Sequence, residues 1–352
     1  MSHDLTSLVE VVGFLVAIMV LAHLCADEGL FEALGHRVAQ LARGSAQASL
    51  ILGVLASTTV TVALSLDATA VLLTPVLLAA ATTSTRRASA YASVRLANSA
   101  STLLPVSNLT NLLAFSATGL TFVGFTARML PVWVVTVAAE YLVLRWWCRH
   151  ELGDPVPRDD APPAVPPLPA AVVAAVLVAL ALEVRPWVAA TMGALVLAVH
   201  ALWHRRTSAR RLIAEANLPF AALVVAWGSA VLLIGDTPVG ESIGRLVPGG
   251  HSWAALVGTA LLAMAVAAVV NNLPATLLLL PAAAAGGADT ILALLIGVNV
   301  GANLAFTSSL ANVLWWRSGG STTTTVRDFH LLGILTTPLL VTLAASTLWL
   351  AR

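Results

Sequence analysis

Long apolar runs recur along the whole chain, and polar residues interrupt only a few of them. A helix that crosses a bilayer needs about 20 mostly apolar residues. Uninterrupted runs that we interpret as spans lie at 8–26, 127–149, 169–184, 186–204, 216–235 and 329–350. Two longer runs, 88–120 and 288–317, contain a polar break and predict discontinuous spanning helices. The pattern therefore predicts an all-α polytopic membrane protein.

Two further stretches, 46–84 and 252–285, have an apolar arm on each side of a polar tip. The arms of each stretch are too short to be two relaxed full spans. We therefore expect each stretch to form a re-entrant helical hairpin whose tip is buried in protein at membrane depth. Asp67 lies in the first tip and Asn272 in the second.

The polar interruptions recur in the same order in the two halves of the chain. The hairpin tips are 205 residues apart, from Asp67 to Asn272, and the broken runs are 201 residues apart, from Ser107 to Ser308. A slowly drifting offset in constant order is typical of a duplicated unit. An even number of predicted crossings separates the first matched spans, so the two units run in opposite directions. The sequence thus predicts two inverted repeats.

Charged residues divide the chain and orient it. Residues 1–150 form the first predicted repeat and 169–352 the second, with a charged, Pro-rich cytoplasmic linker at 151–168. With the N-terminus outside, 13 arginines fall in cytoplasmic segments and four in outer segments, while Arg95 lies inside a span. This asymmetry follows the positive-inside rule. We expect a multi-pass protein of the cell inner (plasma) membrane.

Composition excludes several classes of function. The chain is 59% hydrophobic and 10% charged, which excludes a soluble globular fold, and its net charge of +1 gives no indication of nucleic acid. All 18 basic residues are arginine, so a Walker A loop and a Schiff-base lysine are both excluded. No metal-ligand cluster and no nucleophile–base pair is evident, so we expect neither an enzyme nor a cofactor. Energy for transport must come from an ion gradient or from a partner protein.

Polar residues at the four interruptions are the candidates for solute binding. A helix broken at mid-membrane leaves backbone groups without partners, and the half-helix N-terminus offers a positive dipole end to an oxygen-rich ligand. The alternative is that Asp67, Asn272, Ser107 and Ser308 only cap helix ends. The candidate substrate-binding residues are Asp67, Ala68, Thr69, Asn98, Ser101, Ser107, Asn108, Asn111, Asn271, Asn272, Pro274, Thr276, Asn303, Thr307, Ser308 and Ser309.

Asp67 is the only carboxylate among these interruptions. An ionised carboxylate is costly in apolar surroundings, so Asp67 is a candidate to carry a proton that couples to solute movement. It can also cap the second hairpin arm, and both roles are compatible. Three other polar side chains inside spans, His23, Glu10 and Glu140, are expected to pair with a neighbouring helix rather than bind substrate.

In these segments the chain resembles the arsenical pump membrane protein (arsenite permease) family of the ion transporter superfamily. The segments that carry the resemblance are Asp27–Glu32, Leu66–Pro75, Val106–Asn111, Asn271–Ala275 and Ser308–Trp315. The resemblance covers nearly the whole chain. It implies two inverted repeats, each with a re-entrant hairpin and a discontinuous helix, around one site. It also implies export of arsenite or antimonite in exchange for protons, in some systems with a soluble arsenite-stimulated ATPase.

Three features depart from that family. The chain begins where family members have made about two spans, so the first repeat lacks two leading helices. Asn98 stands where relatives commonly carry Asp, and the stretch 303–307 lacks the typical Pro pattern of the second broken helix. A thiolate site for arsenite would need three cysteines, and the chain has two, Cys25 and Cys148. Neutral arsenite is a small hydroxide that suits Asn, Ser and Thr, whereas the lack of arginine at the breaks argues against a di- or tricarboxylate.

The sequence thus favours a secondary active transporter that exports arsenite or antimonite in exchange for protons. Its partners are then a small inorganic solute, protons or sodium, and the lipid bilayer, with a soluble ATPase and a homodimer left open. One alternative is a sodium-coupled carboxylate transporter or a sodium/proton antiporter of the same superfamily. Another is a non-transporting membrane scaffold or sensor.

Overall fold

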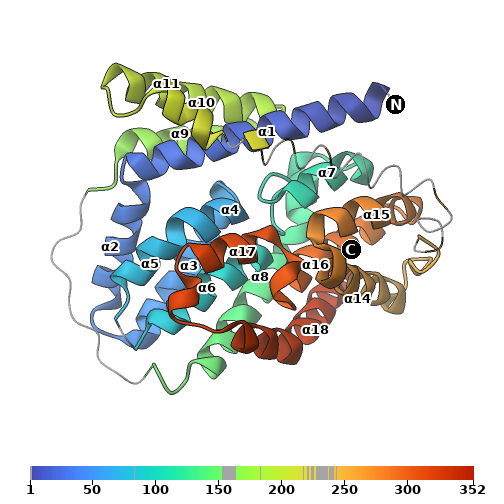
Figure 1. The fold of residues 1–352 in the computed structure, drawn as a ribbon. Helices are drawn as coiled ribbons and strands as arrows, with labels where there is room; N and C mark the ends of the chain where they lie inside the picture. Colours follow the sequence, from blue (N-terminus) through green and yellow to red (C-terminus); the bar gives the residue numbers. More distant parts are fainter. Residues whose placement is uncertain are drawn as a thin grey trace.

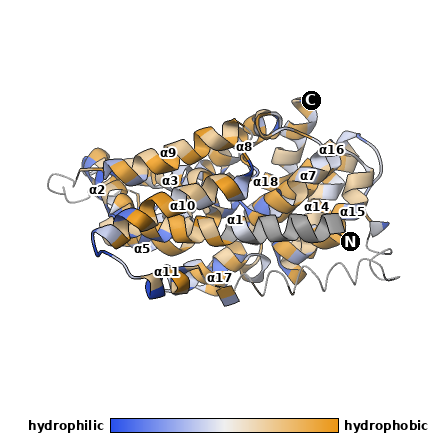
Figure 2. Cartoon of the chain, turned by 90° about the horizontal axis from the view of Figure 1, so that it is seen from above, coloured by the Kyte–Doolittle hydropathy of each residue, from blue (hydrophilic) through white to orange (hydrophobic). Residues whose placement is uncertain are grey.

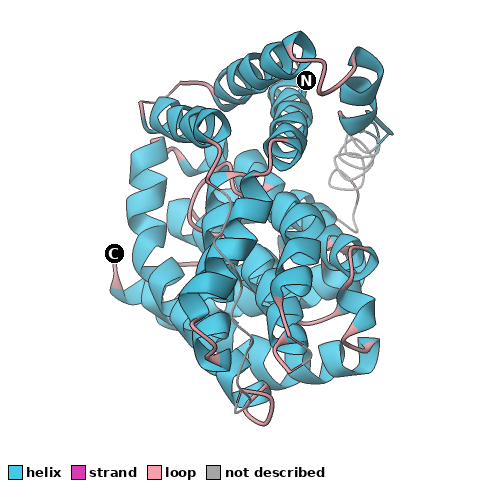
Figure 3. Cartoon of the chain, turned by 90° about the vertical axis from the view of Figure 1, so that its left-hand side faces the viewer, coloured by secondary structure: helices cyan, strands magenta, loops and turns pink. Residues whose placement is uncertain are grey.

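The structure is a computed structural model that describes residues 2–82, 84–152, 164–182, 184–216 and 244–352, with isolated positions between 217 and 243. Within these residues all regular structure is helical (Figure 3). The all-α fold predicted from the sequence is therefore confirmed. Most of the predicted span at 216–235 and most of the predicted linker at 151–168 lie outside the described residues.

The helices follow the predicted runs closely. In the first half they are α1 (Ser2–Asp27), α2 (Leu30–Ala42), α3 (Ala46–Ala63), α4 (Leu66–Ala68), the π-helix η1 (Thr69–Leu73), α5 (Thr74–Ala80), α6 (Arg86–Ala100), α7 (Leu109–Thr118) and α8 (Phe122–Trp147). In the second half they are α9 (Pro167–Ala181), α10 (Pro186–Trp203), α11 (Ala209–Glu215), α14 (Trp253–Val270), α15 (Asn272–Ala285), α16 (Ala288–Asn299), the 3₁₀ turns η2 (Val300–Asn303), η3 (Phe306–Ser308) and η4 (Gly320–Thr322), α17 (Leu310–Arg317) and α18 (Val326–Leu350).

Five helices within the described residues are long and apolar enough to cross a membrane: α3, α8, α10, α14 and α18. The chain is thus a multi-pass membrane protein, and Figure 2 shows that apolar residues cover most of its helices. The two arms of each hairpin differ in length. The first arm of each hairpin, α3 or α14, has 18 residues and is long enough to span by itself. Only the second arms, α4 to α5 and α15, are shorter.

Each hairpin turns sharply at a polar cap. Ser65 accepts a hydrogen bond from the backbone N–H of Ala68 (3.1 Å) and so starts the second arm of the first hairpin. Asn271 turns the second hairpin with φ +79° and ψ 155°, a backbone conformation that is rare for residues other than glycine. Beyond the first tip the helix widens to a π-turn, because Pro75 has no N–H to donate to the carbonyl four residues earlier.

The two halves exchange their half-helices. Helix α7, which follows the first break, packs on α15 and α16 of the second half, and α17, which follows the second break, packs on η1 and α6 of the first half. Helices α8 and α18 pack on each other alongside the breaks. Helices α1, α9, α10 and α11 form a separate group along the upper edge of Figure 1, where α1 packs mainly on α10. The exchange brings both breaks to the centre of the molecule.

Candidate functional site

Each break in a spanning helix is closed by an asparagine from the half-helix that follows it. Asn111 donates from Nδ2 to the backbone carbonyls 10 and 7 residues earlier, at 2.8 and 3.0 Å. Asn312 donates in the same way to the carbonyls 10 and 7 residues earlier, at 2.9 and 3.2 Å. The carbonyls of Ser101 and Ala302 lie at helix ends, whereas those of Leu104 and Ala305 lie in the breaks and also accept from the backbone N–H groups three residues later. The same hydrogen-bonded break is therefore built twice, at the 201-residue offset read from the sequence.

The two breaks are also bonded to each other, in a reciprocal manner. Asn98 Nδ2 donates to Asn312 Oδ1 at 2.8 Å, and Asn299 Nδ2 donates to Asn111 Oδ1 at 2.6 Å. Asn98 and Asn299 are themselves 201 residues apart, so the two bonds are counterparts. All four side chains are fully buried. An approximate two-fold relation thus links the two halves at the centre of the fold.

Each hairpin tip docks on the break of its own half. Ser107 accepts at its carbonyl from the N–H of Leu66 (3.2 Å) and donates from Oγ to a carbonyl in the last turn of α3 (3.2 Å). In the second half, Asn271 Nδ2 donates to the carbonyl of Thr307 (3.1 Å), and Thr307 Oγ1 donates to a carbonyl in the last turn of α14 (3.1 Å). We call the region where both tips (64–66 and 270–272) and both breaks (101–108 and 304–309) meet the junction.

Helix capping is done by neighbours of the expected residues. The side chains that accept from the first turns of α4, α7, α15 and α17 belong to Ser65, Asn108, Asn271 and Ser309. The capping explanation therefore does not apply to Asp67, which lies in the helical first turn after its cap. Alignment of the two tip caps, Ser65 and Asn271, gives an offset of 206, which pairs Asp67 with Leu273 instead of Asn272.

A buried ion pair adjoins the junction. Glu140 on α8 accepts from Nε of Arg95 at 2.6 Å and from Nη2 of Arg95 at 3.2 Å. It accepts in addition from Ser99 Oγ at 2.7 Å and from Asn303 Nδ2 at 3.0 Å. Arg95 donates a further bond to Thr336 on α18 at 3.1 Å. Both charged side chains are at most 2% exposed, so the two charges are compensated by each other and by the surrounding hydrogen bonds, and not by solvent.

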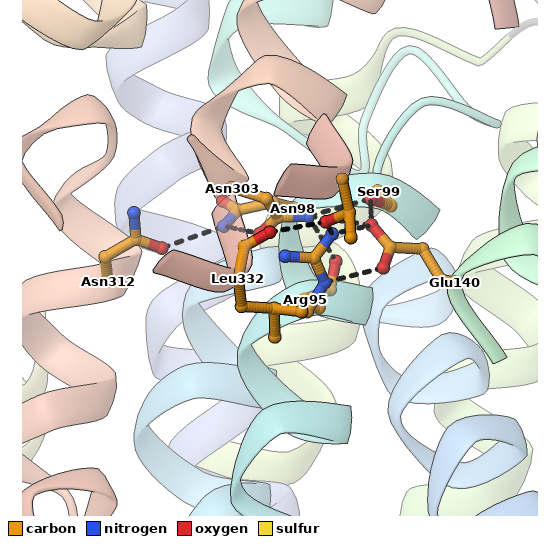
Figure 4. Close-up of polar contacts among 8 residues, drawn as sticks. Arg95, Asn98, Ser99, Glu140, Asn303, Asn312 and Leu332 are labelled. Carbon is orange, nitrogen blue, oxygen red and sulfur yellow. Dashed lines mark hydrogen bonds and ion pairs between the residues drawn. The ribbon is translucent and has the colours of Figure 1, made fainter. Parts of the chain in front are cut away.

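The ion pair is connected to the break-to-break bonds through Asn303. Asn98 donates both amide hydrogens, one to Asn303 Oδ1 at 2.9 Å and one to Asn312. Figure 4 shows the resulting line of polar side chains, which runs from Asn312 through Asn98 and Asn303 to Glu140. The position of the second break is thereby tied to two helices, α6 and α8, that belong to the first half.

A cavity of about 460 Å³ borders the junction on the side of the first hairpin tip. Its walls come from α1, the first hairpin tip, α11 and the start of α17. Most of the lining is apolar, and three side chains in it are titratable: Asp67, His23 and Glu215. Asp67 is partly exposed, and none of the described residues donates a hydrogen bond to it. Its carboxylate is thus available to a solute or a proton.

The predicted site residues separate into three groups. Asp67 and Ala68 line the cavity. Thr69, Asn98, Ser101, Ser107, Asn108, Asn111, Asn272, Pro274, Thr276, Asn303, Ser308 and Ser309 are buried, most of them in hydrogen bonds within the protein. Asn271 is half-buried and Thr307 is exposed, next to the second tip. The structure therefore brings the four interruptions together, but it exposes few of their side chains to the cavity.

Several residues of the site were missed. Asn299 accepts from Asn108 Nδ2 and from Thr110 Oγ1, both at 2.8 Å, and the 201-residue offset from Asn98 would have found it. The Arg95–Glu140 pair was foreseeable as two opposite charges inside spans, which rarely stay unpaired. Glu140 does pair with a neighbouring helix, as expected of such groups.

Comparison with known proteins places the chain in a family. A family model of citrate transporters matches residues 6–311, most of the chain. The chain belongs to the citrate transporter family. This family is a member of the ion transporter superfamily, so the superfamily predicted from the motifs is confirmed, whereas the arsenite permease family within it is not. No curated protein matches the chain. As a citrate transporter family member, the protein is a secondary transporter.

Proposed function

We propose that this citrate transporter family member moves a small, oxygen-rich solute through the junction, and that Asp67 couples this movement to an ion. The single observation that carries the proposal is the carboxylate of Asp67, which accepts no hydrogen bond from the described residues and lines a cavity beside the junction, between α1, the first hairpin, α11 and the start of α17. A solute that passes between two such halves reaches half-helix N-termini and polar caps from both sides. Coupling follows because a carboxylate binds a proton or a cation and loses its charge in doing so.

Arsenite or antimonite, exported in exchange for protons, is the first candidate solute. Neutral arsenite offers hydroxyl groups that both donate and accept, which suits the amides and hydroxyls of the junction. The charges at the cavity also favour a neutral solute, because Asp67 and Glu215 are carboxylates and the one basic side chain in the lining is His23. Arg95, which lies near the breaks, is already paired with Glu140.

A carboxylate carried together with sodium or protons is the second candidate, and the family match favours it. The caps Asn108 and Ser309 each start a half-helix at the junction, so two positive dipole ends are available to an anion. In this case the cation would neutralise part of the solute charge beside Asp67. The two candidates differ in the solute and in whether it moves against the coupling ion or together with it.

Uptake into everted membrane vesicles distinguishes the candidates. Arsenite accumulation that requires an inwardly acidic proton gradient supports the first candidate, and citrate movement that requires sodium or protons supports the second. The Asp67→Asn variant should lower ion-driven transport of the true solute at least tenfold, because an amide cannot take up a proton. Glu32→Gln is the control, since Glu32 is an exposed carboxylate on α2. Full gradient-driven transport by Asp67→Asn would refute the coupling role.

Three further parts of the proposal concern surroundings and partners. The excess of arginine in predicted cytoplasmic segments supports an inner (plasma) membrane with the N-terminus outside. A soluble ATPase partner follows only if arsenite is the solute, and co-purification with such an ATPase would test it. A homodimer, which the resemblance suggests, is tested by the mass of the protein in detergent.

A further inference from the structure

His23 and Glu215 form a contact that requires a proton. Nδ1 of His23 lies 2.9 Å from the backbone carbonyl of Met19. A carbonyl oxygen can only accept, so Nδ1 carries a hydrogen. Nε2 of the same ring lies 2.9 Å from Oε2 of Glu215, and with both groups deprotonated a lone pair would face a carboxylate. One additional proton must therefore sit between His23 and Glu215 for this contact to be attractive.

The surrounding charges place that proton on His23. Arg211 lies with Nε 3.6 Å from Glu215 and donates from Nη2 to Asp27 at 2.8 Å. Arginine is always charged, so it favours the ionised form of Glu215. The proton then resides on the imidazole, which gives an imidazolium–carboxylate pair. Each side chain of the pair is about one-quarter exposed, at 26% and 27%.

Other elements packed around His23 present few titratable groups. The first hairpin contributes Asp67, and α17 contributes only the apolar Leu310 and Leu314 to the cavity. Helix α10 has His200 as its only titratable residue, and α7 and α9 have none. Helix α2, which also packs on α1, carries Glu32, His36 and Arg37, and none of these lines the cavity. At the end of α1, Asp27 is engaged by Arg211, and the next residue, Glu28, pairs with Arg206. Among the described residues of the cavity lining, Asp67 is thus the only acceptor left for the proton of the pair.

We propose that His23 and Glu215 form a proton-loading site that exchanges its proton with Asp67 across the cavity. This inference rests on the proposed coupling role of Asp67. In the transfer, the N–H bond at Nε2 of His23 breaks and an O–H bond forms on the carboxylate of Asp67. The imidazolium becomes neutral imidazole and the carboxylate becomes carboxylic acid, so the net charge of the cavity is unchanged. Glu215 keeps its ion-pair contact with Arg211, whose Nε lies 3.6 Å away.

The transport experiment compares two modes in proteoliposomes of the full chain. The variants are His23→Gln and Glu215→Gln; in the second, the amide N–H can donate to Nε2, so the contact persists without the extra proton. Uptake driven by a proton gradient should fall at least tenfold, while solute counterflow at equal pH should stay within twofold of wild type. An equal loss in both modes would indicate a structural role and overturn the proposal, as would unchanged uptake.

His204→Gln is the matched control variant. Nδ1 of His204 makes the same bond to the carbonyl four residues earlier, at 2.9 Å, and the side chain is exposed. No carboxylate among the described residues lies within ion-pair distance of its ring. Both transport modes should therefore be unchanged. A loss of gradient-driven uptake in this variant would contradict the assignment to His23.

A second measurement does not depend on the solute. Nitrogen-15 spectra of the detergent-solubilised protein, with labelled histidine and assignment by His23→Gln, report which ring nitrogens carry hydrogen. We expect both nitrogens of His23 to carry hydrogen in wild type, as the two contacts require, and only Nδ1 in Glu215→Gln. An unprotonated Nε2 in wild type would overturn the proton-loading site. If wild type moves neither arsenite nor citrate, the proposed function fails, and these spectra still decide the inference.

Discussion

Replacement of Glu140 by glutamine tests whether the ion pair at the centre of the fold is a true buried pair. Glu140 is fully buried and accepts four hydrogen bonds, two from Arg95 and one each from Ser99 and Asn303. Glutamine keeps the shape but removes the charge. The N–H groups of its side-chain amide would face the hydrogen-bond donors that now point at the carboxylate of Glu140. Arg95 would then be a buried cation without a counter-ion. Loss of one partner of a buried ion pair costs about 3–5 kcal/mol.

Thermal unfolding in detergent can be followed with a thiol-reactive fluorophore, because both cysteines, Cys25 and Cys148, are fully buried in the folded protein. A loss of about 3–5 kcal/mol should lower the midpoint on the order of 10 °C. The matched control is Glu151→Gln, whose partner Arg87 lies at 2.9 Å in a pair that is about 30% exposed. That change should cost about 1 kcal/mol or less.

A double variant makes the test quantitative. Arg95→Met combined with Glu140→Leu removes both charges and keeps most of the volume, so it should cost about 2 kcal/mol less than the sum of the two single changes. The reasoning would be refuted if Glu140→Gln lowered the midpoint no more than Glu151→Gln does. Additivity of the two single changes would refute the pairing itself.

Two further predictions concern the second break and the repeat. Gly333→Ala should lower the free energy of unfolding by about 1–3 kcal/mol and should also reduce transport, because a Cβ at this position would meet the backbone carbonyls of residues 303 and 304. Gly53→Ala is the control: nothing lies within 4 Å of its Cβ position, so the change should be neutral or slightly stabilising in the same unfolding assay. Asn111→Ala and Asn312→Ala should each cost about 2–4 kcal/mol, and by similar amounts, because each removes two hydrogen bonds to break carbonyls and leaves one inter-repeat amide donor without its acceptor. A difference of more than about 2 kcal/mol between the two unfolding energies would contradict the equivalence of the breaks.

The helical elements were largely predictable because a bilayer imposes a length and an apolar composition on every spanning helix. The predicted broken runs 88–120 and 288–317 appear as α6 with α7 and as α16 to α17, each with its gap where the polar residues cluster. The hairpin turns were placed within one or two residues. The exact caps were not predictable, because Ser65 and Asp67, or Asn271 and Asn272, have similar side chains, and local backbone angles decide between them.

The candidate site was predictable as a region but not as a set of contacts. Polar residues at membrane depth need partners, so their clustering at four interruptions implied that the interruptions meet. Which amide bonds which was decided by the exchange of α7 and α17 between the halves, a long-range arrangement that no local pattern encodes. Asn98 illustrates the difference: the sequence indicated that it lies at a polar break, but not that its amide donates to Asn303 and Asn312.

The sequence by itself determined the membrane class, the helical runs, their polar interruptions and the 201-residue offset between the halves, because these follow from hydropathy and spacing along one chain. Only the tertiary structure decided the bonds across the halves, the Arg95–Glu140 pair and the His23–Glu215 contact. Their partners lie 45 or more residues apart in sequence, and opposite charges or amides at such separations have many alternative partners until packing selects one. The physical reason is that hydropathy acts on each segment separately, whereas hydrogen bonds and ion pairs depend on which segments come within about 3 Å.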